Sequence, residues 1–104
     1  MNRDTAIEVA KNLINGDRQD HYGTAEDNFN RIAQRWSQFL NIKIEAWQVG
    51  IMMADLKIAR MANGPHNDSF VDGIGYLALA AELSSGDSKT IAEYEELIEG
   101  LIKE

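Results

Sequence analysis

The sequence contains no cysteine and only one proline, Pro65. The lack of cysteine excludes disulfide bonds and thiolate metal sites, and it agrees with a reducing cytoplasm. No apolar run approaches the roughly 18 residues that a membrane-spanning helix needs. Residues 1–4 are followed by a polar amphipathic stretch rather than by the apolar core of a signal peptide. We therefore expect a cytoplasmic protein with no membrane partner.

Basic residues are also scarce. Ten lysines and arginines stand against 17 aspartates and glutamates, which gives a net charge of −7. Nonspecific binding to a nucleic-acid backbone requires clustered basic residues, so we expect no DNA or RNA partner. An acidic protein can still bind a single nucleotide through a few placed cations. The charge therefore excludes nucleic acids as partners and leaves free nucleotides open.

Helical periodicity accounts for every long segment, and no segment alternates as a strand does. The 104 residues, 44% of them apolar, fit a single globular domain spanning residues 1–104. We predict an all-α bundle of about five helices, with the second, third and fourth in the centre. The expected segments are about 4–15, 25–40, about 45–62, from near Asp68 to Ser85–Gly86, and from Ser88 or Thr90 to Ile102.

Residues typical of helix ends mark several of these boundaries. Thr24 is the expected N-cap of the second helix, and Thr90 with Glu93 forms the capping-box pattern of the fifth. Gly16 is the expected end of the first helix. Gly73 and Gly75 lie inside the fourth helix, where each costs about 1 kcal/mol relative to alanine. We expect a neighbouring helix or a ligand to approach their backbone closely.

Familiar catalytic motifs are missing. The sequence has no glycine-rich phosphate loop, no Gly-x-Ser-x-Gly elbow and no His-Glu-x-x-His motif. His21 and His66 alone cannot form a histidine metal site. The catalytic residues are therefore left unassigned. The remaining candidates for a functional site are polar residues in positions that are unusual for a helix.

Three aspartates stand out as candidate ligands. Asp55 shares a helical row with Ile51 and Ile58, so we expect it on the apolar face of the third helix. A buried carboxylate requires an ion pair, a hydrogen bond or a metal, and the pattern leaves these alternatives open. Asp68 and Asp72 are four residues apart at the start of the fourth helix. They either hold a cation together or stabilise the positive end of the helix dipole.

Candidate anion contacts are the next polar group. Lys57 and Arg60 are three residues apart and could clamp a phosphate, although a solvated helix face explains them equally well. The turn formed by His21, Tyr22 and Gly23 precedes a helix start and could bind an anion or stack on a base. The alternative is an ordinary polar loop. Trp36 and Trp47 lie on apolar stripes, and we expect both in the core.

The combined pattern resembles a known group of small proteins encoded by phages and prophages, which includes the "nucleotide modification associated" domains of unknown function. These domains are in turn similar to the all-α nucleoside triphosphate pyrophosphatases of the MazG-like and dimeric dUTPase group. The resemblance covers roughly residues 16–83. It rests on Arg18-x-x-x-Tyr22-Gly23, Asn28-Phe29, Trp36, Leu56-Lys57-Ile58-Ala59-Arg60 and His66-x-Asp68-x-x-x-Asp72-x-x-x-Tyr76.

The resemblance implies a metal site made of paired acids. The enzymes hold magnesium with Glu-x-x-Glu on one central helix and Glu-x-x-Asp on the next. Asp72 matches the acid that closes the second pair, whereas the position three residues earlier is Ser69, with Asp68 one step away. On the preceding helix Asp55 is the only acid inside the segment, after Glu45 at its start, and Met52 occupies the position of its partner. At most three carboxylates therefore stand where the enzymes have four.

The function implied by the resemblance is a nucleotide-pool protein that binds, and hydrolyses if it is an enzyme, a (deoxy)nucleoside phosphate with Mg2+. The relatives build their site between subunits, so a homo-oligomer is expected, either a dimer or a dimer of dimers. The alternatives are a non-catalytic phage accessory module, which binds a host protein or sequesters a nucleotide, and a purely structural oligomer. The assigned residues are Asp55, Asp68 and Asp72 for metal, Lys57, Arg60 and Arg18 for phosphate, and His21, Tyr22 and Tyr76 for base or sugar.

Overall fold

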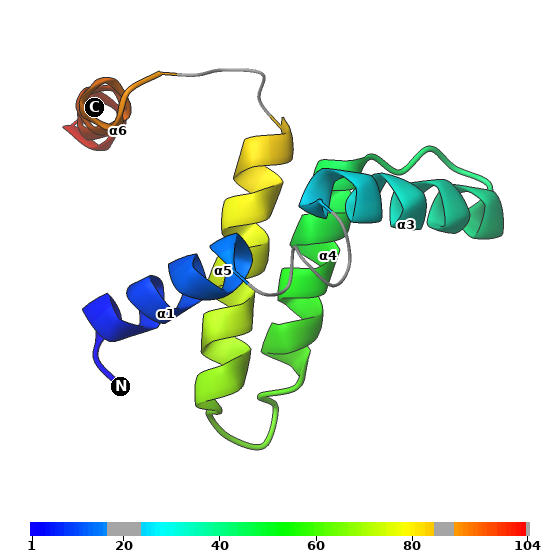
Figure 1. The fold of residues 1–104 in the computed structure, drawn as a ribbon, viewed down its shortest axis with the longest axis horizontal. Coiled ribbons are helices and arrows are strands. Elements are labelled where there is room, and N and C mark those ends of the chain that lie inside the picture. The colour runs from blue at the N-terminus through cyan, green and yellow to red at the C-terminus, as the bar shows by residue number, and fades with distance from the viewer. Residues whose placement is uncertain (17–23, 85–88, 104) are drawn as a thin grey trace.

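The computed structural model describes residues 1–16, 24–84 and 89–103, and these ranges contain helices and no strand (Figure 1). This result confirms the predicted all-α class and the five helices. Within the described ranges, no helix combines the length and apolar character needed to cross a bilayer. The helices are α1 (Arg3–Asn15), α3 (Ala25–Leu40), α4 (Ala46–Ala59), α5 (Asn67–Ser84) and α6 (Ile91–Lys103).

Side-chain caps fix where the helices begin. The Thr24 hydroxyl accepts a hydrogen bond from the Asp27 backbone N–H at 3.1 Å, and the Thr90 hydroxyl accepts one from the Glu93 N–H at 3.2 Å. The Glu93 carboxylate in turn accepts from the Thr90 hydroxyl at 3.0 Å. Both predicted caps are therefore confirmed, and α1 ends before Gly16 as expected.

The third predicted helix ends earlier than expected. Helix α4 stops at Ala59 instead of near residue 62, and residues 60–63 form a turn. In this turn the backbone hydrogen bonds span three residues instead of four, as in the bond from the Met61 N–H to the Ile58 carbonyl at 3.0 Å. Gly64 follows with a φ of 145°, a conformation that glycine adopts without steric cost. The chain thus reverses direction between α4 and α5.

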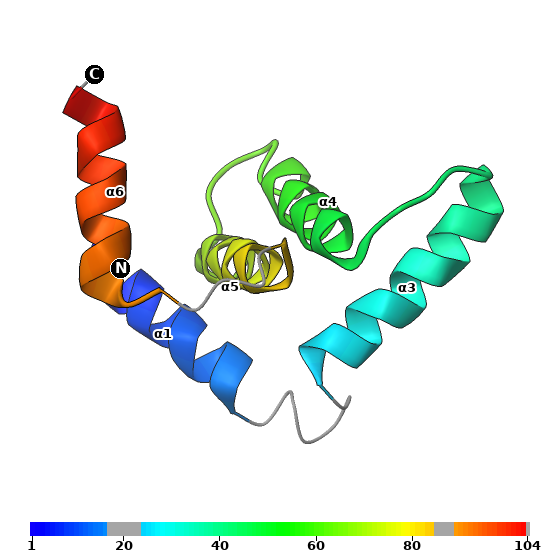
Figure 2. The same cartoon turned by 90° about the horizontal axis from the view of Figure 1, so that it is seen from above.

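Helices α4 and α5 form an antiparallel pair at the centre of the molecule (Figure 1). Helix α1 packs against α5, and α3 packs against α4. Figure 2 shows α1 and α3 on the same side of the central pair, and Figure 1 shows α6 apart from the other helices. The prediction that the second to fourth helices are central holds most strongly for α4 and α5.

Close backbone contacts bring these helices together. A Cβ atom at Gly50 would lie 2.8 Å from the Ala80 Cβ, which is too close for two carbon atoms. The absence of a side chain at residue 50 therefore allows the close approach of α4 to α5. A Cβ atom at Gly75 would lie 3.1 Å from Cγ2 of Ile14, which confirms the expected approach of a neighbouring helix. At Gly73 no neighbouring helix makes this approach, because a Cβ there would meet nothing within 4 Å.

The main core lies where α3, α4 and α5 meet. Phe29, Ala33, Ile44 and Val49 are buried there, with other apolar side chains packed around them. Trp36 is one of these, as predicted from its apolar stripe. Trp47 is only half-buried, and its indole N–H donates to the Glu45 carboxylate at 2.8 Å. The core thus joins α3 to the central helix pair.

The expected burial of Asp55 is wrong. Asp55 is exposed, and its row-mates Ile51 and Ile58 are 44% and 61% exposed. Helix α4 is apolar on nearly every side, so its sequence does not reveal which row faces the core. An exposed apolar row also follows α5, where Phe70 and Leu77 lie seven residues apart. We call these four apolar residues the outer rows of α4 and α5.

Candidate functional site

A hollow of about 420 Å³ opens between the helices on the side of α1 and α3. Its volume lies in the range of small-molecule pockets, which is about 300–1,000 Å³. Four helices supply its walls, so the pocket depends on the complete packing of the domain. The lining residues are Ala10, Leu13, Ile14, Thr24, Ala25, Asn28, Phe29, Lys57, Val71, Asp72, Gly75, Tyr76 and Leu79.

An ion pair between two helices forms one wall of the pocket. The Lys57 Nζ on α4 lies 3.0 Å from Oδ2 of Asp72 on α5, and the two side chains are only 14% and 15% exposed. At this burial, solvent screens the pair less than it screens a surface salt bridge. The ammonium carries three N–H donors, and contact with one carboxylate oxygen does not use all of them. Lys57 can therefore bind a further acceptor from the pocket.

Aromatic rings form the neighbouring wall. The ring centroids of Phe29 and Tyr76 lie 6.2 Å apart, with an angle of 28° between the ring planes. Phe29 is almost fully buried, whereas Tyr76 is half-buried. The rest of this surface is apolar, with contributions from α1 and α5. A flat apolar ligand group would find a matching surface here.

The first turn of α3 adds a polar edge. Asn28 is half-buried and presents an amide group, which can donate and accept hydrogen bonds. The Thr24 hydroxyl already accepts from the Asp27 N–H and retains its own proton for donation. The positive end of the α3 dipole lies at the same edge, so this part of the pocket favours negative charge.

The structure brings together some of the predicted site residues and separates others. Lys57, Asp72 and Tyr76 line one pocket. Arg60 is exposed in the turn after α4 and does not line it. Asp68 is exposed in the first turn of α5, and Asp55 is exposed on the outer row of α4. Arg18, His21 and Tyr22 lie outside the described residues.

The three aspartates predicted to hold magnesium do not form one group. In the part of the chain that the structure describes, no three histidine, aspartate or glutamate side chains gather where a metal ion could bind. Asp72 has the Lys57 ammonium as its partner instead. The described residues of one chain therefore do not fit a magnesium site, and this arrangement supports no chemical step through a metal.

Several pocket residues were not predicted from the sequence. Asn28 and Phe29 belong to the family-like pattern, but neither was assigned to a site. Thr24 was assigned only as a cap. The contribution of α1 was missed altogether, because small and aliphatic residues such as Ala10 and Ile14 resemble ordinary core residues. For the wall formed by α1, the sequence predicted only that a neighbouring helix or a ligand approaches Gly75, and Ile14 of α1 makes that approach.

Comparison with known proteins supplies the family. Residues 5–84 match the model of a domain of unknown function, DUF6378. The chain is 38% identical over 79 residues to the Gene 55 protein of Mycobacterium phage L5, covering 74% of this chain and 51% of that protein. It is 35% identical over 98 residues to the Gene 55 protein of Mycobacterium phage D29, covering 93% and 58%. This chain thus spans little more than half the length of these relatives.

No solved structure matches the chain, so the resemblance to the MazG-like fold has no structural counterpart among the comparisons. The family match covers all four helices that form the pocket and stops before α6. The phage relatives agree with the expected resemblance to phage-encoded proteins of unknown function. The chain belongs to the DUF6378 family of domains of unknown function.

Proposed function

We propose that the pocket binds a nucleoside phosphate and that the protein acts on the nucleotide pool by holding this ligand. The observation that carries the proposal is the position of Lys57, a largely buried cation on the wall of a pocket whose neighbouring wall is aromatic. A nucleotide combines an anionic group with a flat ring, and the pocket offers a complementary group for each. As a family member with phage relatives, the protein would act in the cytoplasm of a bacterial host.

The phosphate would lie against Lys57 and the first turn of α3. The ammonium provides charge-assisted hydrogen bonds, which are roughly twice as strong as neutral ones. Asp72 holds the ammonium in place through the 3.0 Å contact. Asn28 and Thr24 add polar groups at the same edge. Of the residues predicted to bind phosphate, Lys57 therefore retains this role, whereas Arg60 lies outside the pocket.

The base would lie along the apolar wall. Tyr76 and Leu79 from α5 offer a half-buried surface beside Phe29, and α1 closes the hollow from the other side. Aromatic rings favour offset stacking at centroid distances of about 4.5–7 Å, so a base near Tyr76 would extend the existing pair with Phe29. Tyr76 thereby keeps its predicted role as a base or sugar contact.

Two versions of the function follow, hydrolysis and holding without turnover. Metal-dependent hydrolysis requires a set of carboxylates around the phosphate chain. The described residues of one chain contain no such set, which favours the non-catalytic version. A second copy of the chain could supply further acids, and the predicted homo-oligomer therefore belongs to the same proposal. The exposed apolar outer rows of α4 and α5 support self-association.

The pocket assignment can be tested by removing the ion pair as a unit. In Lys57→Met/Asp72→Asn both charges disappear and the side-chain volumes are nearly retained, so neither partner is left as a buried, unpaired charge. We expect calorimetric binding of nucleoside phosphates to weaken about tenfold or more, consistent with loss of a charged hydrogen bond worth about 1.5–3 kcal/mol. Arg60→Met is the matched control, because Arg60 lies outside the pocket. Equal loss in the control, or unchanged affinity in the double variant, would contradict the assignment.

Turnover and magnesium are tested separately. Release of pyrophosphate or phosphate from a panel of nucleoside triphosphates with millimolar Mg2+ would establish hydrolysis, and its absence alongside measurable binding would establish holding. A metal site held by the protein should raise the melting temperature when Mg2+ is added without nucleotide. Asp72→Asn should then abolish this rise. A melting temperature that ignores Mg2+ in the parent would reject the protein-held metal site.

A further inference from the structure

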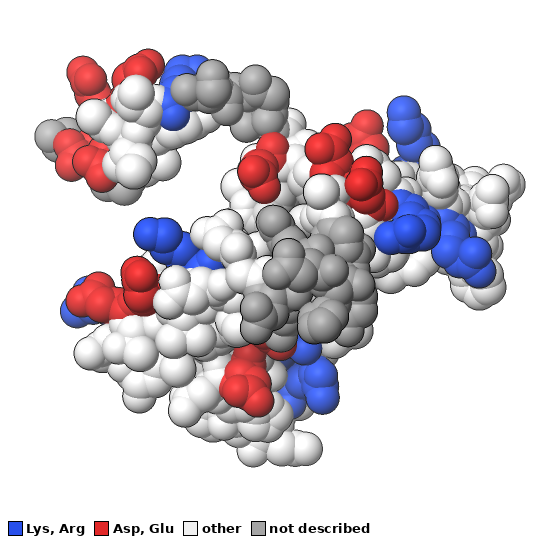
Figure 3. Space-filling model, in the orientation of Figure 1, with Lys and Arg blue, Asp and Glu red and all other residues white. Residues whose placement is uncertain are grey.

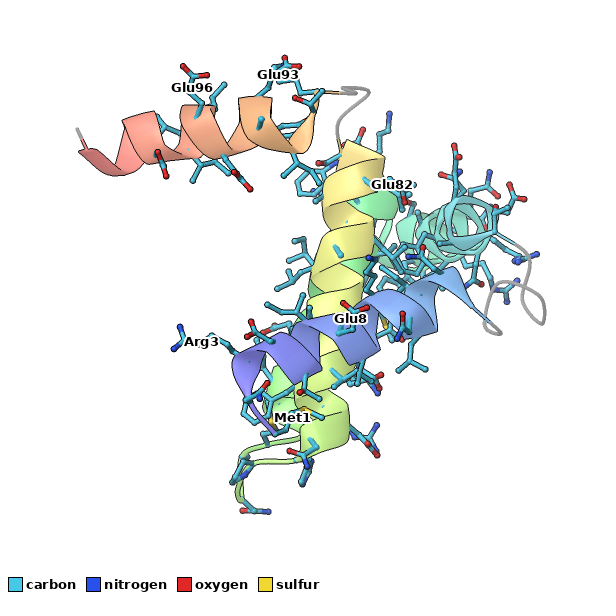
Figure 4. The ribbon with its side chains drawn as sticks, turned by 60° about the vertical axis from the view of Figure 1, so that its left-hand side comes forward. Met1, Arg3, Glu8, Glu82, Glu93 and Glu96 are labelled. Atoms are coloured by element: carbon cyan, nitrogen blue, oxygen red, sulfur yellow. The ribbon has the colours of Figure 1, made fainter. Side chains whose placement is uncertain are left out.

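Helix α6 carries an apolar stripe that the rest of the molecule leaves uncovered. Ile91, Leu97, Ile98 and Leu101 are 52–79% exposed, and α6 lies apart from the other helices (Figure 1). Figure 4 shows Glu93 and Glu96 extending from α6 away from the molecule. Helix α6 contains four glutamates, and its one basic residue, Lys103, is at its C-terminal end. A 13-residue helix is only marginally stable in isolation, so an exposed stripe on α6 requires a partner.

The far half of α3 has the opposite charge. Residues 31–44 contain three basic residues and no acidic one. Arg31, Arg35 and Phe39 follow each other at intervals of four along one row of α3, and all three are exposed. Phe39 is 88% exposed, and Leu40 and Ile42 beside it are 51% and 62% exposed. This surface combines a basic row with an uncovered apolar end.

The two surfaces match in charge and in spacing. On α6, Glu95 and Glu99 are four residues apart and border the apolar stripe. On α3, Arg31 and Arg35 have the same separation, which corresponds to about 6 Å along a helix axis. Two helices packed side by side can therefore align both charge pairs while Phe39 meets the aliphatic stripe of α6.

A chain does not bring its own α6 to its own α3. The two helices lie at opposite ends of the molecule in both views (Figures 1 and 2). The charges are divided in the same way in Figure 3, where blue atoms gather over α3 and red atoms over the distant α6. A second copy of the chain, by contrast, offers both surfaces at once.

We propose that α6 of one copy docks on the far half of α3 of a second copy. Each copy has one α6 and one α3 surface, so two copies related by a two-fold axis make the contact twice and close as a dimer. The glutamates of α6 meet the arginines of α3, and the apolar stripe covers Phe39. The contact leaves the pocket residues untouched and goes beyond the proposed nucleotide binding.

A mixing experiment tests this pairing. One variant carries Arg31→Glu/Arg35→Glu and the other Glu95→Lys/Glu99→Lys. Each variant alone opposes like charges at both contacts and should associate at least about tenfold more weakly than the parent. In a mixed dimer, the altered, acidic α3 of the first variant meets the altered, basic α6 of the second. The unaltered α6 of the first variant meets the unaltered α3 of the second. Sedimentation velocity should therefore show a mixed species with about twice the mass of either variant alone. Any association through the outer rows is present in every sample and does not change this comparison.

Matched controls change the same charges elsewhere. Glu8→Lys/Glu82→Lys adds four positive charge units outside the contact, and Arg3→Glu/Lys11→Glu removes four. Both controls should associate like the parent, and all variants should keep the parent's circular dichroism and nucleotide affinity. A mixture in which the two variants stay separate would overturn the proposal, as would a parent that remains 11.6 kDa at high concentration. Failure of nucleotide binding in the parent would leave this test unaffected.

Discussion

Residue 50 and residue 73 are both glycines within helices, but their surroundings differ. A Cβ at Gly50 would lie 2.8 Å from the Ala80 Cβ and 3.2 Å from the Tyr76 carbonyl oxygen, whereas a Cβ at Gly73 would meet nothing within 4 Å. Helix propensity favours alanine at both positions by about 1 kcal/mol. Only at Gly50 is this gain opposed by overpacking, which typically costs about 1–3 kcal/mol.

We therefore predict opposite effects from the same substitution. Gly50→Ala should lower the free energy of unfolding by up to about 2 kcal/mol, because α4 and α5 must separate to admit the methyl group and this cost exceeds the gain in helix propensity. Gly73→Ala should raise it by about 0.5–1 kcal/mol. Urea unfolding of both variants beside the parent measures the difference. A stabilised Gly50→Ala variant would mean that the helices separate at little cost.

At the candidate site, sequence analysis found individual residues more readily than their arrangement. Lys57 was selected with Arg60 as a pair of cations three residues apart, and Asp72 was selected with Asp68 as a pair of acids four residues apart. The contact between Lys57 and Asp72 depends on how α4 and α5 align side by side, and helical periodicity within each segment does not contain that information. The sequence therefore assigned Lys57 to phosphate and Asp72 to metal, whereas the structure pairs them with each other.

At the level of helices, boundaries were predictable where a local interaction determines them. Thr24 and Thr90 each satisfy backbone N–H groups within their own first turn, and such caps are visible in the sequence. The assignment of helix faces was less predictable. Helix α4 is apolar on nearly all sides, so only its contacts with α3 and α5 determine which row is buried. The row that contains Asp55 is exposed, and periodicity within α4 did not predict this.

The isolation of α6 makes its cap unusually important. Thr90→Ala removes the side-chain acceptor for the Glu93 N–H, a change that costs about 1 kcal/mol. Because α6 receives little support from packing within the chain, this loss should unfold a measurable fraction of α6 in dilute protein. Backbone chemical shifts of residues 91–98 would report the loss. In Thr24→Ala, the matched change in α3, packing against α4 should keep the helix formed and lower only the overall stability.

For the whole molecule, stability should depend on concentration through α6. A chain ending at residue 89 lacks α6 and retains the four helices that contact one another. In dilute solution it should melt within a few degrees of the parent. At high concentration the parent should melt at a higher temperature than it does when dilute, because association stabilises the folded state. The shortened chain should show a smaller shift, because association through the outer rows of α4 and α5 does not require α6. An equal shift in both chains would assign the association to another surface.

The pocket also has a consequence for the order of folding. Helices α4 and α5 are joined by a short turn, so their contacts close a small loop, whereas the contact between Ile14 and Gly75 closes a much longer one. Long loops are entropically costlier to close, and local contacts therefore tend to form first. We expect the central hairpin to be structured in the folding transition state and α1 to dock afterwards. Truncating Ile14 to alanine should then accelerate unfolding and leave the folding rate nearly unchanged. Since α1 forms one wall of the pocket, the pocket would form only in this late step.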